Sequence, residues 1–243
     1  MSVYGDIIDK LKRKKVHMTL IDPASQSLQE SARIAIEAER AGTDFIMIGG
    51  STRINSELMD KTVEIIKAKT SLKTIIFPGS PEMISSKADA IYYMSLMNSR
   101  NIEFIIGHQV KTSLLLRKLA IETISMAYLV FEPGMTVGRV GEANLIKRDD
   151  CDTALLYAIA AETFGMKLIY LESGSGSPTY VSESVVKRIK DYIRIPVIVG
   201  GGIRTREAAE SLANAGADII VTGTIVERNS NVYEALHDII SSI

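Results

Sequence analysis

Eight short, nearly continuous apolar segments recur along the chain, and most are followed by a segment with helical periodicity. The apolar segments span residues 16–22, 44–50, 73–79, 90–96, 124–131, 167–173, 196–202 and 218–224. Strands buried on both faces of a parallel sheet have this character. Helical patterns lie at about 28–41, 55–69, 105–120, 152–164, 181–193, 205–215 and 230–241. This alternation predicts one α/β domain over residues 1–243, a closed (βα)₈ barrel of the TIM type.

Length and composition agree with a single barrel. The 243 residues are close to the roughly 250 of a plain barrel of this type. A net charge of −1 argues against a broad basic face for nucleic acid. No apolar run approaches the ~18–20 residues of a membrane span, and the one cysteine, Cys151, excludes an internal disulfide. We therefore expect a cytoplasmic protein.

Two stretches depart from the regular alternation. About ten residues, SPEMISSKAD, separate the third and fourth strands, fewer than a crossover helix needs. We expect the third helix to be missing or reduced, which would open a groove in the side of the barrel. The glycine-rich segment 132–150 has the length of lids and substrate-contacting loops. The amphipathic N-terminal segment predicts a solvated first helix.

Glycines follow the last two strands, in VIVGGGIRT and IIVTGTIVE. The loops after strands seven and eight of such barrels commonly bind phosphate through backbone N–H groups, and an approaching phosphate leaves no room for a Cβ atom. Gly200–Gly202, Gly223 and Thr224 therefore predict a phosphate site, and we expect Gly202 and Gly223 to tolerate no side chain in a fold that stays intact. The alternative is a tight turn without a ligand.

Carboxylates stand at the ends of two other strands. Glu172 ends strand six ahead of Ser173-Gly174-Ser175-Gly176, where it could accept a proton from a substrate hydroxyl. We expect it to keep enough water to stay ionised near neutral pH; a solvated glutamate in a linker loop is the alternative. Asp22 and Ser51 end strands one and two and together suit Mg²⁺. Asp22-Pro23 could equally be a turn.

The three histidines predict no catalytic role. His17 begins the first strand and is expected to be structural, His108 to lie on a helix surface, and His237 to be solvated on the last helix. No His–Cys or Ser–His–Asp arrangement is evident in the sequence, so nucleophilic catalysis is not expected.

Eight motifs together resemble the geranylgeranylglyceryl phosphate synthase family. They are, in order, HMTLIDP, IMIGGST, FPGS, YYMSLMNS, YLVFEPG, YLESGSG, VIVGGGIR and VTGT, within residues 16–228. The resemblance implies a prenyltransferase that joins the 3-hydroxyl of sn-glycerol 1-phosphate to geranylgeranyl diphosphate. Such an enzyme releases pyrophosphate and forms the first ether bond of archaeal membrane lipids. It also implies a modified TIM barrel whose third helix is replaced, and a homo-oligomer (dimer or hexamer). A peripheral membrane contact for the lipid product is the alternative interpretation of the basic, amphipathic N-terminal segment.

Site residues follow from the resemblance position by position. The family's Mg²⁺ ligands fall on Asp22 and Ser51, its general base on Glu172, and a tyrosine near the substrate on Tyr128. Its glycerol 1-phosphate site falls on Tyr170, Leu171, Glu172, Ser173, Gly174, Ser175, Gly176, Gly201, Gly202, Gly223 and Thr224. Many relatives have Gly-Asn where this chain has Gly223-Thr224; a backbone contact would survive that change. The segment ISMAYLVFEPG, which is strand five and the start of its loop, departs from the P-E-G-Y form that is commoner in the family. The shape of the site wall that this segment forms is therefore not predicted.

The prenyl chain needs an apolar groove. The aromatic and methionine residues of strand four and of the loop after it could line one, or could be ordinary core; they are Tyr92, Tyr93, Met94, Met97 and Phe104. Three other functions share parts of the pattern: a heptaprenyl- or other-length prenylglyceryl phosphate synthase, a phosphosugar isomerase barrel, and a non-catalytic barrel that binds a phosphorylated metabolite.

Overall fold

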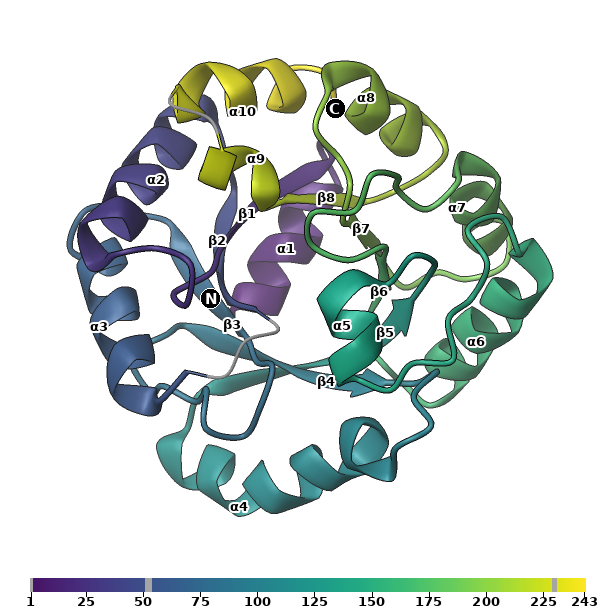
Figure 1. The fold of residues 1–243 in the computed structure, drawn as a ribbon, viewed down its shortest axis with the longest axis horizontal. Helices are drawn as coiled ribbons and strands as arrows, with labels where there is room; N and C mark the ends of the chain where they lie inside the picture. The colour runs from purple at the N-terminus through teal and green to yellow at the C-terminus, as the bar shows by residue number, and fades with distance from the viewer. Residues whose placement is uncertain (1, 51–53, 229–230) are drawn as a thin grey trace.

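Eight parallel strands close into a barrel in chain order, as predicted. The structure is a computed structural model and describes residues 2–50, 54–228 and 231–243. Figure 1 looks down the barrel, with the strands in a ring inside a layer of helices. The strands are β1 (Val16–Ile21), β2 (Phe45–Gly49), β3 (Lys73–Phe77), β4 (Ala90–Leu96), β5 (Glu122–Val130), β6 (Leu168–Glu172), β7 (Val197–Gly200) and β8 (Ile219–Thr222).

Most helices cover the outside of the barrel. This outer layer consists of α2 (Leu28–Ala41), α3 (Ser56–Lys67), η1 (Glu103–Gly107) with α4 (His108–Leu119), α6 (Cys151–Thr163), α7 (Glu183–Lys190), α8 (Arg206–Asn214) and α10 (Val232–Ile240). The short helices α5 (Met135–Val140) and α9 (Thr224–Arg228) lie inside this layer in Figure 1. No helix in the described ranges is long and apolar enough to cross a membrane.

The helix that should connect β3 to β4, the third of a regular (βα)₈ barrel, is absent, which confirms the prediction. The helix labelled α3 connects β2 to β3. Residues 78–89 connect β3 to β4 without a helical segment. β3 pairs with β4 only through Ile75–Ala90 and Ile76–Ile91, whereas β4 pairs with β5 along its whole length. The wall is therefore weakly closed between β3 and β4, and α4 covers it from outside.

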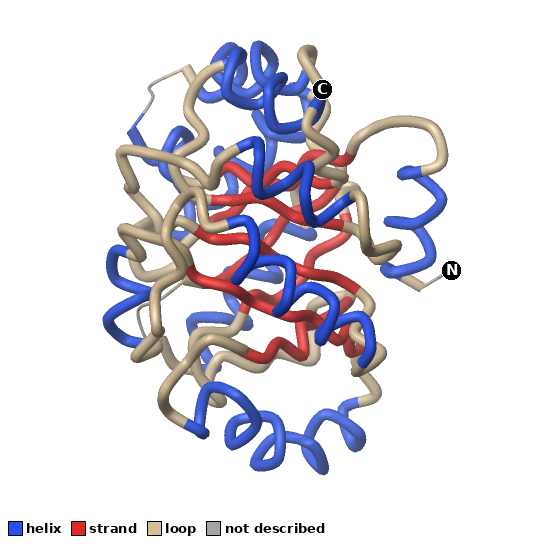
Figure 2. The backbone as a smooth tube through the Cα atoms, turned by 90° about the vertical axis from the view of Figure 1, so that its right-hand side faces the viewer, coloured by secondary structure: helices blue, strands red, loops and turns tan. Residues whose placement is uncertain are grey.

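The N-terminal helix α1 (Val3–Leu11) closes the barrel at the amino-terminal end of the strands, on the right in Figure 2. Val3 and Ile7 are buried in the same cluster as the first residues of the strands, and the Val3 and Tyr4 N–H groups donate to the Glu122 carboxylate at the start of β5. Sequence reasoning expected a solvated helix. That expectation is wrong for its apolar face, because the open end of a barrel offers apolar surface to bury.

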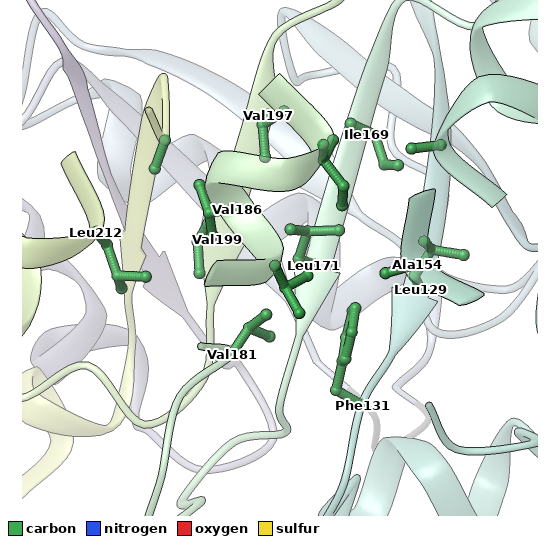
Figure 3. Close-up of a cluster of buried hydrophobic side chains, with 14 of the residues drawn as sticks. Leu129, Phe131, Ala154, Ile169, Leu171, Val181, Val186, Val197, Val199 and Leu212 are labelled. Atoms are coloured by element: carbon green, nitrogen blue, oxygen red, sulfur yellow. The ribbon is translucent and has the colours of Figure 1, made fainter. Parts of the chain in front are cut away.

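Alternate strand residues point to opposite sides of the barrel wall, which decides where the functional groups lie. Outward-pointing residues such as Leu129 and Leu171 pack against α6, α7 and α8 in a continuous core (Figure 3). Inward-pointing residues such as Tyr128 and Tyr170 fill the barrel interior. Glu172 lies two residues beyond Tyr170 and so shares its inward direction at the carboxyl end of the strands.

Capping residues begin and end several of the helices. Ser27 and Thr205 accept hydrogen bonds from the backbone N–H groups of Glu30 and Ala208, and Gly42 and Gly216 have positive φ. Ser182 precedes α7 but makes no such bond; its Oγ lies 2.9 Å from Oγ of Ser184 instead.

His17 is a structural residue, as predicted. It is fully buried, and its ring nitrogens lie 3.0 Å from Oγ1 of Thr43 and 3.1 Å from Oγ1 of Thr222. Burial lowers the pKa of His17 to about 3, so the ring is neutral near pH 7. It ties β1 to β8 and to the turn before β2.

Candidate active site

A small polar pocket lies at the carboxyl ends of β6, β7 and β8. Of the residues predicted for the phosphate site, it brings together Tyr170, Glu172 and Ser175, then Gly201 and Gly202, then Gly223 and Thr224. α9 begins at Thr224, so the first turn of a short helix stands at the edge of the pocket. This is the place and the construction expected for phosphate binding in a barrel.

The glycines of the pocket differ in how strongly the backbone requires them. Gly201 and Gly202 have φ of +82° and +79°, a left-handed conformation that favours glycine. A Cβ atom on Gly202 would collide with the carbonyl group of Thr179. Gly223 lacks both constraints, since its nearest neighbour would lie 3.5 Å away. A side chain at Gly202 should therefore destabilise the fold, whereas the prediction of an intact fold meets no steric obstacle at Gly223.

Two side chains hold the loop that follows β6. Oγ1 of Thr224 accepts a hydrogen bond of 3.0 Å from the Gly176 N–H group. Nη2 of Arg204 donates to the carbonyl oxygens of Gly176 and Ser177, at 2.9 and 2.8 Å. Arg204 also lines the pocket and brings a positive charge to it. Sequence reasoning missed this role, although Arg204 follows the glycines directly in GGGIR.

Glu172 is the acidic residue of the polar pocket and is buried, with 5% of its surface exposed. Oε1 accepts a hydrogen bond of 2.6 Å from the Gly174 N–H group, and Oε2 accepts one of 3.1 Å from the Tyr128 hydroxyl. Burial raises the pKa of Glu172, opposed by these bonds and by one from Tyr170. The expectation of a well-hydrated carboxylate is wrong, because tyrosines from the barrel interior surround it.

Five residues predicted for the phosphate site are not in the lining of the polar pocket. Gly200 ends β7, where a Cβ atom would collide with the Tyr170 hydroxyl. The side chain of Leu171 points outward into the helix-covered core. Ser173 is fully buried beside Glu172, and its Oγ has no hydrogen-bond partner within the described ranges. Gly174 and Gly176 shape the loop, with φ of +98° and +76°.

A large apolar groove begins beside the polar pocket, on the side of the barrel where the third helix is absent. Its empty space amounts to about 840 Å³ and includes solvent at its open side. Its walls come from the β3–β4 connection, β4, η1, α4 and α5. Tyr92, Tyr93, Met94 and Phe104 line it as predicted, but Met97 does not; it packs against the outer core.

Aromatic residues join the groove to the polar pocket. Tyr128 lines the groove, Tyr170 lines the pocket, and their ring centroids are 5.3 Å apart. Phe77 stacks on Tyr170 at 5.5 Å and meets Tyr128 edge-on at the same distance. His108 also lines the groove, edge-on to Phe104, so it faces the site and not only the helix surface.

Asp22 directly follows β1, which pairs with β8 on one side and with β2 on the other. Its Oδ1 accepts a hydrogen bond of 2.9 Å from the Ala24 N–H group, so the predicted turn is present. Burial raises the pKa of Asp22, and no cationic side chain within the described ranges contributes to that pKa. A half-buried carboxylate without a counter-charge is suited to a cation. Ser51 lies outside the described residues, and no group of three or more His, Cys, Asp or Glu residues that could hold a metal is found among those described.

Comparison with known proteins identifies the family. The sequence matches the model of the PcrB family over residues 9–242. The chain belongs to the PcrB family. The geranylgeranylglyceryl phosphate synthase of Picrophilus torridus is 84% identical over the full length of both chains. The enzyme of the same name from Thermoplasma acidophilum is 64% identical, covering 100% of this chain and 96% of that one. The family resemblance predicted from the motifs is confirmed.

One solved structure of the family contains a substrate. It is (S)-3-O-geranylgeranylglyceryl phosphate synthase from Thermoplasma acidophilum in complex with sn-glycerol-1-phosphate. The TM-score is 0.99 at 64% sequence identity, covering 100% of this chain and 98% of that chain. This member of the PcrB family therefore has the barrel of a structurally characterised synthase.

Proposed function

We propose that this protein is a geranylgeranylglyceryl phosphate synthase, which joins sn-glycerol 1-phosphate to geranylgeranyl diphosphate. One observation carries the proposal: Glu172 in the polar pocket is hydrogen-bonded to Tyr128 in the wall of the apolar groove. A carboxylate at the junction of a phosphate-sized pocket and a long apolar groove suits a reaction that joins a phosphate ester to a prenyl chain. An isomerase of small sugar phosphates would leave the groove without a use.

The relatives support the same assignment. The relatives that are 84% and 64% identical carry this enzyme name, and the Thermoplasma acidophilum structure holds sn-glycerol-1-phosphate. In this chain the phosphate would lie against Gly201, Gly202 and Gly223, with Arg204 supplying positive charge. The hydroxyl end of the substrate would then face Glu172.

The residues of the junction account for the chemistry. The 3-hydroxyl oxygen of glycerol 1-phosphate attacks C1 of the prenyl chain, and the bond from C1 to the diphosphate oxygen breaks with its electron pair leaving on pyrophosphate. Glu172 takes the hydroxyl proton. Its raised pKa makes it a stronger base than an exposed glutamate. The polar pocket and the groove hold the two reacting atoms near each other.

We propose that Asp22 holds Mg²⁺ with help from water and diphosphate oxygens, and Ser51 remains a predicted second ligand. The uncompensated carboxylate of Asp22 supports this role. The ion would supply the charge that neutralises the departing diphosphate. Asp22 itself is held in position by its bond to the Ala24 N–H group.

The test of the proposed function is product formation in parallel reactions. Purified protein, Mg²⁺ and radiolabelled sn-glycerol 1-phosphate are incubated with C15, C20 or C35 prenyl diphosphate, and lipid-soluble label is measured. We expect the C20 substrate to give the highest kcat/KM. Preference for the C35 substrate would indicate a heptaprenyl enzyme, and absence of product with all three would contradict the proposal.

A homo-oligomer is also part of the proposal. Four apolar residues recur every four positions from the residue before η1 into α4, and each is 49–64% exposed: Ile102, Ile106, Val110 and Leu114. Apolar stripes of this kind are usually covered by a neighbouring chain. Sedimentation at micromolar concentration should show a dimer or hexamer; a monomer would contradict it.

A further inference from the structure

Ser80 is a buried polar residue in the wall of the apolar groove that the proposed mechanism does not use. Its side chain is 3% exposed, and within the described ranges its Oγ has no hydrogen-bond partner. A buried hydroxyl without a partner costs free energy, so it is kept where a ligand or an ordered water completes it. A turn holds the backbone of Ser80 in place, because the Ser80 carbonyl oxygen accepts a hydrogen bond of 3.1 Å from the Met83 N–H group.

Ser80 lies next to the ends of β1 and β2 in the fold. Gly79, the residue before it, packs so closely that a Cβ atom there would collide with the carbonyl of Gly50. A Cβ atom on Gly50 would in turn lie 2.5 Å from Oδ2 of Asp22. The ends of β1, β2 and β3 thus form a row that leads from the proposed cation ligand to Ser80.

Among the described residues that line the groove, one other buried side-chain atom has no hydrogen-bond partner, and it cannot do the same chemistry as Ser80. Gln109 lies in the α4 wall of the groove with its Oε1 unpartnered, while its Nε2 donates to the Met94 carbonyl. An amide oxygen only accepts hydrogen bonds, so it cannot bind an ionised phosphate oxygen. A serine hydroxyl can donate, and donation to an anionic oxygen is among the stronger hydrogen bonds in proteins.

We propose that Ser80 binds the diphosphate group of the prenyl substrate, and the pyrophosphate product, by donating a hydrogen bond from its hydroxyl. This inference rests on the proposed function, because it assigns the head group of the second substrate to the β3–β4 connection. The missing third helix then has two consequences: it opens the apolar groove and it brings Ser80 into the wall of that groove.

The test is the Ser80→Ala variant, with inorganic pyrophosphate and Mg²⁺ as the probe in titration calorimetry. We expect pyrophosphate to bind about tenfold more weakly than to the wild type, the equivalent of one charge-assisted hydrogen bond. The KM for geranylgeranyl diphosphate should rise by a similar factor, and the KM for glycerol 1-phosphate should stay within about twofold. The melting temperature should stay the same or rise, because the variant removes an unpartnered buried hydroxyl.

Ser85→Ala is the matched control. Ser85 lies in the same connection and is 2% exposed, but its hydroxyl donates to the Asp60 carboxylate. Its loss should lower the melting temperature and leave pyrophosphate affinity unchanged. If Ser80→Ala does not fold, Ser80→Cys keeps the shape with a weaker donor and should show the same loss of pyrophosphate affinity.

The outcomes separate this inference from the function itself. Unchanged pyrophosphate affinity in a folded Ser80 variant, while the wild type forms product, overturns the role of Ser80 alone. A drop in stability with equal weakening for both substrates also overturns it, because that result indicates a structural serine. Absence of product with the wild type overturns the proposed function.

Discussion

The hydroxyl of Tyr128 donates a hydrogen bond of 3.1 Å to Oε2 of Glu172, from β5 to the end of the neighbouring strand β6. Tyr128 belongs to the wall of the apolar groove and Glu172 to the polar pocket. The bond therefore crosses the boundary between the two proposed substrate sites, and it stabilises the ionised form of the carboxylate.

Replacing Tyr128 by Phe should shift the pH dependence of the reaction. Losing this bond raises the pKa of Glu172 further, so the acidic limb of the kcat/KM profile should move up by about half to one pH unit. Tyr180→Phe is the control, because Tyr180 donates a similar bond to Glu183 away from the pocket. A Tyr128→Phe profile that overlays the wild type would show that this bond does not tune the base.

Gly202 and Gly223 should respond differently to alanine. Gly202→Ala should lower stability by about 1–3 kcal/mol, since its φ is +79° and its methyl group would meet the Thr179 carbonyl. Gly223→Ala should melt close to the wild type but raise the KM for glycerol 1-phosphate about tenfold or more, because the methyl group occupies the pocket. Thermal melting and steady-state kinetics on both variants check this; an unchanged KM for Gly223→Ala would place the phosphate elsewhere.

Much of the fold is predictable because its signals are local. Each strand is a short run of apolar residues, and helix starts such as Ser27 and Thr205 bond their own first turns. The absence of a helix between β3 and β4 follows from the short length of that connection alone. No comparable pattern predicts α5, because six residues with Gly138 among them carry too little periodicity. The burial of one face of α1 depends on the barrel that it closes.

The site is predictable in its place but not in its environment. Glu172 lies at the carboxyl end of β6 and its side chain points into the barrel, so the sequence predicts correctly that it meets the glycines after β7 and β8. Its exposure is set by Tyr128 and Tyr170, whose inward packing emerges only when the barrel closes. Arg204 acts on carbonyl groups 27 and 28 residues away in sequence, a contact that no local pattern reveals. The resemblance to a known family supplied roles for residues that spacing alone leaves open.

His17 should make stability fall with acid. Its pKa is about 3 in the folded protein and about 6.5 when unfolded, so the unfolded state binds the extra proton between these values. Stability is fully present above about pH 6.5 and decreases as pH falls toward 3, by about 1.4 kcal/mol per pH unit at most from this residue. Urea unfolding from pH 7 to pH 4 should show a smaller loss in His17→Gln than in the wild type. Equal losses in the two proteins would contradict the assignment.

Asp22→Asn should separate the metal ligand from the turn residue. Asparagine keeps an oxygen for the Ala24 N–H group but loses the charge. If Asp22 holds Mg²⁺, the variant should lose a few kcal/mol of transition-state stabilisation, about a hundredfold or more in kcat/KM, and excess EDTA should abolish wild-type turnover until Mg²⁺ is restored. Full activity of the wild type in EDTA, or of the variant, would leave Asp22 with the turn alone.

Glu172→Gln tests the central claim, that this carboxylate takes the proton of the attacking hydroxyl. Glutamine keeps the shape and an acceptor for the Gly174 N–H group but cannot act as a base. Single-turnover rates and glycerol 1-phosphate affinity are measured on the same preparation. We predict a rate lower by roughly 10²–10⁴ with an affinity within about threefold of the wild type, because the phosphate contacts lie on other loops. A near-wild-type rate, or a parallel collapse of rate and affinity, would contradict Glu172 as the general base.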